Sequence, residues 1–337
     1  MKLATIRNGS PDGRLVVVSD DLRLAVAATG VAESMREAIE RWAEAEPELR
    51  AIAARLESGQ APSAFDFAQE HCAAPLPRSF QWCDGSAFLH HGRLMERAFN
   101  LEPIPESDFI PLMYQGAGDD FLGAREDVHL PDEAHGIDFE GEFGVIVDEV
   151  PMGISAQEAL NKIRLVVQIN DWSLRALGPR EMRSGFGFVQ AKPSTSFAPV
   201  AVTPDSLGEA WQNGRVCMHL NIEWNGEHFG RPFGGEMHFH FGELVAHAAR
   251  TRRLTPGTII GSGTVSNERG DLGSACIAER RVIEMLDSGA AKTSFMRFGD
   301  TVRMEARAAA ASQTERGPFG VIHQRVVSAV PTDSRGA

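Results

Sequence analysis

Short apolar runs separated by polar turns are the main feature of the hydrophobic pattern along this chain. The runs at 143–147, 163–169, 216–223 and 258–260 are too short for most helices, and Gly, Pro, Asn or Asp bounds nearly all of them. Such runs are typical of strands. At the start of the chain, two β-rich runs around a turn with Gly and Pro predict a hairpin over residues 3–18. The pattern therefore predicts a chain in which strands dominate.

Helical patterns are confined to a few segments. Residues 34–56 are dominated by Ala, Glu, Arg and Leu, and Ser34 with Glu37 matches a capping box at the start of this stretch. Further helices are expected over 155–161, after a turn that ends in glycine, and over 242–251. Together with the strands, these segments predict an α+β fold in which β structure is the larger part.

A connector at 72–79 divides the pattern. This stretch, CAAPLPRS, contains two prolines and little periodicity. We therefore predict a small N-terminal domain over residues 1–78 and a larger domain over 79–332, while the polar end at 333–337 should fray. The length of 337 residues exceeds the usual single-domain size, which agrees with one large domain and a smaller one.

Composition and charge narrow the classes of function. Hydrophobic residues make up 43% of the chain and charged residues 23%, as in ordinary globular proteins. The formal net charge of -13 makes nucleic acid and anionic membranes unfavourable partners. The four cysteines lie far apart without a CxxC pair, so neither a thiolate metal site nor a disulfide framework is expected. With no signal peptide and no run that could span a bilayer, we expect a cytoplasmic protein.

The sharpest local signal is a pair of acids in the stretch DFEGEFGVIV. Glu140 and Glu142 would project from one face of a strand, roughly 6 to 7 Å apart. Two such carboxylates repel and need a cation between them, unless one takes up a proton. An isolated pair of this kind more often lies on a solvated edge face. Here the strand continues as the apolar run 143–147, which indicates burial.

Two further acids stand near chemically versatile residues. Asp171 follows an apolar run in the stretch NDWSLR, at a strand end of the kind where sites collect. In the simpler alternative, Asp171 caps a helix that begins at Trp172, and Arg175 is its partner four residues on. Asp84 stands seven residues before His91. A lone histidine is more often structural than catalytic, so the spacing of Asp84 and His91 alone does not establish a catalytic role.

A second cluster of possible metal ligands lies in the stretch MHFHFGE. His238 and His240 would share a strand face, and Glu243 and His247 would share a helix face. A nitrogen-rich metal site is therefore a competing interpretation. In the simpler alternative this segment begins a surface helix whose basic end favours the helix dipole.

Six motifs in order make the chain resemble the fumarylacetoacetate hydrolases, in the shorter form common in bacteria. The resemblance runs from about residue 80 to about residue 326. It implies a mixed β-sandwich roll that carries the site, preceded by a small N-terminal α+β domain, and a homodimer. The motifs are DxxxxxxH at Asp84 and His91, DFEGEFG at 138–144, NDWSLR at 170–175, KPSTS at 192–196, GSGTVSN at 261–267 and CIAERR at 276–281.

The resemblance also implies one bound divalent cation, Mg²⁺ or Ca²⁺, with Mn²⁺ as a further option. Oxygen ligands suit these hard cations and disfavour zinc and copper. The implied metal ligands are Asp84, Glu140, Glu142 and Asp171.

The remaining implied roles concern catalysis and substrate binding. The resemblance implies that His91 is a general base on water and that Glu279 orients it. Members closer to the animal enzymes carry an aspartate and then a glutamine after NDWS, whereas Leu177 and Gly178 come after Arg175 here, so one substrate contact is missing or supplied elsewhere. The residues implied to bind substrate or stabilise an oxyanion are Arg175, Lys192, Thr264 and Tyr114, the only tyrosine.

The implied activity is hydrolysis of a carbon–carbon bond in a small anionic β-diketo acid. The leading substrate is fumarylacetoacetate, which gives fumarate and acetoacetate in tyrosine and aromatic catabolism. Similar family activities stay open: acylpyruvate or fumarylpyruvate hydrolysis, oxaloacetate decarboxylation and 2-keto-4-pentenoate hydration. A binding or scaffold protein without catalysis is a further alternative, but the presence of the whole ligand set together with His91 and Lys192 argues against it.

Overall fold

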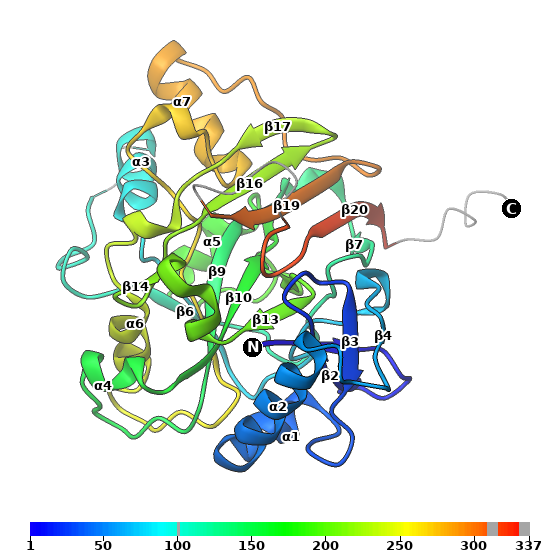
Figure 1. Cartoon of the computed structure of the whole chain (residues 1–337). Helices are drawn as coiled ribbons and strands as arrows, with labels where there is room; N and C mark the ends of the chain where they lie inside the picture. The colour runs from blue at the N-terminus through cyan, green and yellow to red at the C-terminus, as the bar shows by residue number, and fades with distance from the viewer. Residues whose placement is uncertain (100–101, 309–315, 330–337) are drawn as a thin grey trace, which may run out of the picture.

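The computed structural model describes residues 1–99, 102–308 and 316–329 (Figure 1). The predicted fraying at 333–337 lies outside these residues, as does the end of the predicted 79–332 domain. The α-helices are α1 (Met35–Glu40), α2 (Trp42–Glu57), α3 (Leu89–Phe99), α4 (Ala156–Leu160), α5 (Gly178–Ser184), α6 (Phe241–Ala248) and α7 (Ile277–Ser288).

Strands form most of the regular structure, which confirms the predicted β-dominated α+β fold. The strands are β1 (Lys2–Ile6), β2 (Arg14–Val18), β3 (Leu24–Ala27), β4 (Phe65–Asp66), β5 (Trp82–Gly85), β6 (Met113–Gly116), β7 (Val128–Leu130), β8 (Ile137–Asp138), β9 (Gly141–Val147), β10 (Ile163–Asn170), β11 (Ser173–Leu174), β12 (Ser196–Phe197), β13 (Val200–Val202), β14 (Trp211–Gln212), β15 (Arg215–Val216), β16 (His219–Trp224), β17 (Glu227–Gly230), β18 (Ile259–Gly261), β19 (Thr301–Arg307) and β20 (Ile322–Ser328).

The largest sheet crosses the predicted domain boundary. Its strand order is β4-β3-β2-β1-β13-β10-β9-β18-β5-β6, with β12 paired to β10. Strand β1 pairs with both β2 and β13, so the first strands of the chain extend the sheet that contains β9 and β10. The boundary at residue 78 therefore runs through a continuous sheet, and its position stays a prediction.

A second sheet lies against the first and encloses the main core. Its order is β17-β16-β19-β20-β7, and in Figure 1 it lies above the central part of the large sheet. Alternate residues of β9, such as Phe143 and Val145, belong to the main core together with Leu220 of β16 and Met304 of β19. On the other face of β9, Ile146 belongs to a second core that includes residues of α1 and α2. Strand β9 is thus buried on both faces, which explains its continuous apolar run.

Most local predictions are confirmed. The N-terminal hairpin forms from β1 and β2, and the apolar runs at 143–147, 163–169 and 258–260 fall in β9, β10 and β18. The run at 216–223 is interrupted between β15 and β16.

The predicted helical regions also form, with one interruption. The helix expected over 34–56 is divided at Arg41 into α1 and α2. Ser34 caps α1 by accepting from the Glu37 N–H, while the Glu37 carboxylate accepts from Glu33 N. The segments 155–161 and 242–251 contain α4 and α6, and a complete capping box begins α4.

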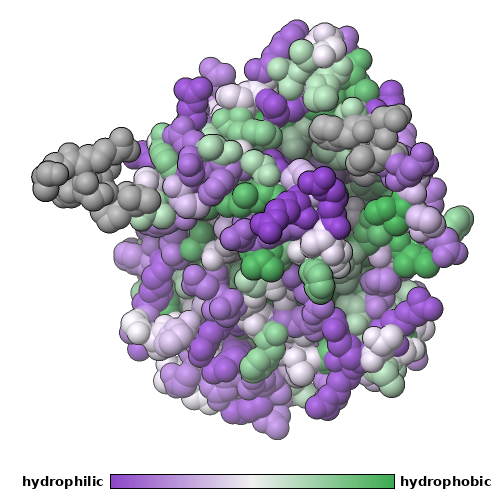
Figure 2. All heavy atoms as spheres, turned by 180° about the vertical axis from the view of Figure 1, so that it is seen from behind, coloured by the Kyte–Doolittle hydropathy of each residue, from purple (hydrophilic) through white to green (hydrophobic). Residues whose placement is uncertain are grey.

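The surface in Figure 2 is mostly hydrophilic, with apolar side chains in small separate groups. Within the described ranges, we find no helix with both the length and the hydropathy that crossing a membrane would require.

Candidate active site

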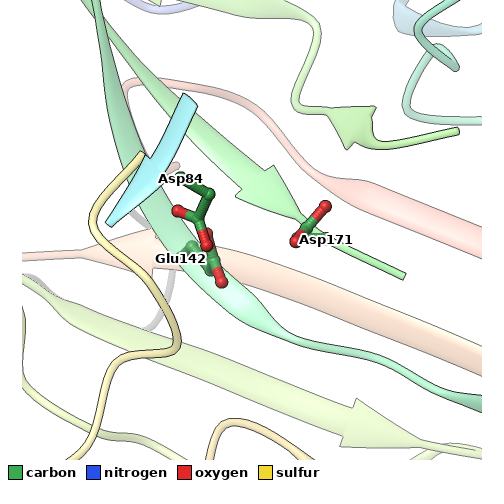
Figure 3. A group of neighbouring side chains, drawn as sticks. All are labelled: Asp84, Glu142 and Asp171. Carbon is green, nitrogen blue, oxygen red and sulfur yellow. The ribbon is translucent and has the colours of Figure 1, made fainter. Parts of the chain in front are cut away.

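Strand register brings three acids onto one face of the large sheet. Asp84 of β5 lies opposite Gly261 of β18, and the next strand, β9, carries Glu142. Glu142 lies opposite Ile169 of β10, and Asp171 follows that strand by one residue. One oxygen from each carboxylate of Asp84, Glu142 and Asp171 lies within 4.8 Å of the others. Figure 3 shows the three side chains together. These three predicted ligands therefore come together from separate strands.

The three acids are suited to a cation. Neither carboxylate oxygen of Glu142 has a hydrogen-bond partner, although both are buried. Burial raises the pKa of the Glu142 carboxyl well above its usual value, and the neighbouring charges of Asp84 and Asp171 raise it further. The pKa of Asp84 is raised by burial and by Asp171 in the same way. Unpartnered, mutually repelling carboxylate oxygens are the ligand set that a hard divalent cation prefers.

Glycines give the Asp84 carboxylate its place. The Gly263 N–H donates to Asp84 Oδ1 over 2.9 Å, and Gly263 has a φ of 74°, which favours glycine. A Cβ on Gly261 would collide with Asp84 Oδ1 and with the Trp82 ring. The glycines at the end of β18 and in the turn after it therefore position the Asp84 carboxylate.

We expect Gly261→Ala to weaken Mn²⁺ binding at least about tenfold, because the new methyl group must displace the Asp84 carboxylate from the other two acids. Isothermal titration calorimetry would measure the change. Gly270→Ala is the matched control, since a Cβ on Gly270 meets no atom within 4 Å. Equal affinities for both variants would contradict the placement of Asp84.

Asp171 is held by three side chains. Lys192 Nζ and the Tyr114 hydroxyl each donate to Asp171 Oδ2 over 2.6 Å, and Thr195 Oγ1 donates to Asp171 Oδ1 over 2.6 Å. The Lys192 ammonium lies 5.5 Å from the centre of the Tyr114 ring. Burial followed by the charge of Asp171 raises the pKa of Tyr114 well above its usual value, so the hydroxyl stays protonated and donates.

Glu140 lies beside the three acids but is surrounded by cations and hydroxyls. Arg175 Nη2 lies 2.6 Å from Glu140 Oε1, and Lys192 Nζ lies 3.1 Å from Oε2. The hydroxyls of Ser173 and Thr264 donate to the same carboxylate over 2.8 and 2.7 Å. Burial by itself would raise the pKa of Glu140, but Arg175 and Lys192 outweigh it and hold the pKa far below its usual value. Its role as a fourth metal ligand stays a prediction.

His91 and Glu279 form a pair between two helices. His91 Nδ1 on α3 lies 2.9 Å from Glu279 Oε2 on α7, and Glu279 is almost fully buried. A carboxylate at this distance favours the tautomer with the proton on Nδ1, which leaves Nε2 free to act as a base. A positive charge on the His91 ring would lower the pKa of Glu140, so the pair lies within electrostatic reach of that carboxylate.

The sequence analysis missed Asp138 as a functional residue. Its carboxylate accepts from Arg175 Nε over 2.8 Å and from the N–H groups of Ile277 and Ala278 over 2.7 and 2.9 Å. Asp138 thus connects Arg175, which pairs with Glu140, to the beginning of α7. Its position as the first residue of the DFEGEFG motif was the available signal.

The structure excludes the simpler alternative for Asp171. No helix begins at Trp172, because Ser173–Leu174 forms β11 and pairs with β8. Asp171 is therefore not a helix cap, and Arg175 pairs with Asp138 and Glu140 instead. Two further partners were not predicted. Thr195 of the KPSTS motif donates to Asp171, and Ser173 of the NDWSLR motif donates to Glu140.

The histidine-rich stretch does not form a metal site. His240 caps α6 by accepting from the Gly242 N–H over 3.0 Å, and His238 Nε2 contacts the Asp108 carbonyl at 3.0 Å. Residues 237–240 are not a strand, so the two histidines do not share a strand face. In the described part of the chain, the acids around Glu142 are the one group of three such side chains with suitable spacing.

Two family profiles match the chain. The profile described as "Fumarylacetoacetate (FAA) hydrolase C-terminal" matches residues 81–327, and the profile described as "Fumarylacetoacetase N-terminal domain 2" matches residues 1–78. A 2,4-didehydro-3-deoxy-L-rhamnonate hydrolase from Sphingomonas is 30% identical over 165 residues, covering 48% of this chain and 54% of the relative. A human mitochondrial oxaloacetate tautomerase is 25% identical over 165 residues, covering 48% and 49%. The chain spans about half the length of the curated relatives it matches.

Solved structures share the whole fold. A maleylpyruvate hydrolase from Sphingobium, in complex with manganese(II) and pyruvate, has a TM-score of 0.64 at 15% identity, covering 98% of this chain and 100% of that chain. A fumarylacetoacetate hydrolase from Exiguobacterium antarcticum has a TM-score of 0.62 at 17% identity, covering 97% and 99%. These likenesses support the architecture described above.

Proposed function

Because this chain belongs to the fumarylacetoacetate hydrolase family, we propose that it is a metal-dependent enzyme that hydrolyses a carbon–carbon bond in a small anionic diketo acid. The observation that carries the proposal is the group of three buried acids, with the His91–Glu279 pair within electrostatic reach of the adjoining Glu140. The acids are suited to hold a cation, and the pair is suited to activate water. A buried carboxylate without a hydrogen-bond partner, such as that of Glu142, is costly to keep and favours a functional site over a scaffold.

In this proposal, Asp84, Glu142 and Asp171 hold one Mg²⁺, Ca²⁺ or Mn²⁺ ion, with Glu140 as the predicted fourth ligand. The cation, when bound, supplies Lewis-acid activation of the substrate's carbonyl oxygens and stabilises negative charge on them. Asp171 is fixed by hydrogen bonds from three side chains, and such outer contacts hold a ligand in one orientation.

His91 moves the protons. Its Nε2 takes a proton from water, which then attacks the carbonyl carbon, and later returns a proton to the departing carbon. Glu279 keeps the Nδ1 proton in place and stabilises the charged ring. The Lys192 ammonium meets the oxyanion of the tetrahedral intermediate, and Thr264 binds substrate beside it. Arg175 keeps its predicted substrate-binding role, although in this structure it pairs with Asp138 and Glu140.

Fumarylacetoacetate is the first substrate to test, with tyrosine or aromatic catabolism as the setting. Acylpyruvates are the second candidate, because relatives and structural neighbours include a hydrolase of a 2,4-didehydro-3-deoxy sugar acid and a maleylpyruvate hydrolase. Tyr114 is proposed to contact a substrate carboxylate, which its hydroxyl can reach only by sharing or exchanging its bond to Asp171. A homodimer in the cytoplasm completes the proposal.

We expect protein stripped with a chelator to lose turnover and to regain it when Mg²⁺, Ca²⁺ or Mn²⁺ is added, because the cation held by the three acids supplies the Lewis acid of the proposed reaction. Ultraviolet absorbance follows fumarylacetoacetate consumption, and acylpyruvates are assayed in parallel. Turnover of an acylpyruvate alone would move the assignment to that class. Turnover of neither class by metal-loaded protein would refute hydrolysis of diketo acids.

A further inference from the structure

One segment near the candidate site is held mainly by a single carboxylate. Helix α5 and the residues that follow it lead to Lys192. The Glu181 carboxylate accepts from the backbone N–H groups of Val189, Gln190 and Ala191 over 3.1, 2.8 and 3.0 Å. We propose that Glu181 is a positioning residue of this site, which acts through Lys192 and Phe188. The proposal rests on the function proposed above.

The first connection runs along the backbone to Lys192. Ala191 is buried, and while its N–H donates to Glu181, its carbonyl accepts from the Leu174 N–H over 2.8 Å. The peptide units on both sides of Ala191 are therefore fixed, and the second of them joins Ala191 to Lys192. The Lys192 ammonium lies between Asp171 and Glu140, at 2.6 and 3.1 Å. Loss of the hydrogen bond between Ala191 and Glu181 would remove one of the two restraints on the backbone that positions the Lys192 ammonium.

The second connection runs through an aromatic pair. The rings of Phe188 and Tyr114 meet edge to face, with centroids 5.2 Å apart and an interplanar angle of 81°. The Tyr114 hydroxyl donates to Asp171, one of the three acids. Phe188 comes directly before the three residues that Glu181 binds. Loss of these hydrogen bonds would therefore also free the ring that covers Tyr114.

Apolar burial cannot hold this segment in place. Met182, Phe186 and Val189 are 63%, 95% and 80% exposed, and α5 has no buried residue. Hydrogen bonds to a charged acceptor are stronger than those between neutral groups, and three of them converge on Glu181. The three N–H groups, with Gln190 first, also hold the pKa of the Glu181 carboxyl below its usual value, so it is ionised at neutral pH.

The test uses Glu181→Gln in the full-length, metal-loaded protein. Glutamine keeps the size but replaces one acceptor oxygen with a donor, so it cannot accept all three N–H groups. Glu284→Gln is the matched control, because Glu284 on α7 accepts from the Lys292 and Thr293 N–H groups over 2.6 and 2.9 Å. Hydrogen–deuterium exchange over residues 185–196 reports the anchoring, and steady-state kinetics report its effect on the site.

We expect faster exchange in Glu181→Gln and a kcat lowered roughly tenfold with KM changed less than about twofold, because Lys192 is proposed to act on the transition state. The control should match the wild type in kcat and in exchange over 185–196. Unchanged exchange would overturn the anchoring. Faster exchange with unchanged kcat would mean that Glu181 serves the loop alone, and that result would also overturn the proposal.

A readout without substrate separates this proposal from the function it rests on. If the wild type hydrolyses no diketo acid, the proposed function fails. Calorimetric titration with Mn²⁺ then tests the positioning role of Glu181 without substrate. A loosened Lys192 ammonium opposes the cation less, so Glu181→Gln should bind Mn²⁺ about threefold tighter or more. An unchanged dissociation constant in that titration would overturn the positioning role.

Discussion

Replacement of His91 with alanine is expected to lower kcat by a factor of about 10³, while the Mn²⁺ dissociation constant changes less than about threefold. General base catalysis by a positioned side chain contributes a factor of this size. Metal affinity should persist because the His91 ring contacts Glu279. The group of side chains placed to hold the cation consists of three acids and does not include His91. Stopped-flow kinetics with the best diketo acid and calorimetry with Mn²⁺ measure the two quantities separately.

The neighbouring histidine provides a matched control for this prediction. His90 precedes His91 on α3, and His90→Ala removes an imidazole from the same turn of the same helix. Its kcat should stay within about twofold of the wild type. Parallel loss of turnover and metal affinity in His91→Ala would refute the role as general base, as would an equal loss of kcat in both variants.

Glu142→Gln is expected to weaken Mn²⁺ binding at least about 100-fold and to stabilise the metal-free protein. The substitution removes one of three anionic ligands, whereas even indirect contacts to a metal ligand are worth 10- to 100-fold. In the metal-free protein, the same carboxylate is buried without a hydrogen-bond partner and close to two other acids. Burial and the two neighbouring acids raise the pKa of this carboxyl well above its usual value, so folding at neutral pH must protonate it, at a cost of about 1.4 kcal/mol for each pH unit above its usual pKa. A neutral amide avoids this cost and should raise the stability by about 1 to 3 kcal/mol.

Two measurements test the weaker Mn²⁺ binding and the higher metal-free stability expected for Glu142→Gln. Calorimetry gives the Mn²⁺ affinity, and thermal melts in chelator and in excess Mn²⁺ give the change in stability. Glu149→Gln is the control, because Glu149 is a largely exposed acid just beyond the end of β9. A Glu142→Gln variant that melts lower than the wild type in chelator would show that this carboxylate has a favourable partner, contrary to the structure described here.

The sequence predicted the local structure well where the hydrophobic pattern was compatible with only one kind of secondary structure. The run at 143–147 became β9, and the segment 155–161 contains α4. The pattern failed where local and distant contacts compete. The helical composition of 34–56 is continuous, but the chain turns at Arg41 so that α1 and α2 can both cover the N-terminal strands.

The candidate site shows the same division. The alternation of side chains in a strand places Glu142 and Ile146 on one face, and this can be read from the sequence. Equal spacing gave no sign that Glu140 and Glu142 would have different surroundings. Glu140 meets Arg175 and Lys192, while Glu142 meets two other acids, because these partners come from distant parts of the chain.

The sequence by itself therefore determined which residue types and strand faces are available, and the six ordered motifs identified the family. Only the tertiary structure decided that β18 lies between β5 and β9, so that Gly261 leaves room for Asp84. It also decided that Glu181 holds the backbone before Lys192. The physical reason is that periodicity follows from local backbone geometry, whereas strand neighbours and loop anchors follow from contacts between segments far apart in the chain.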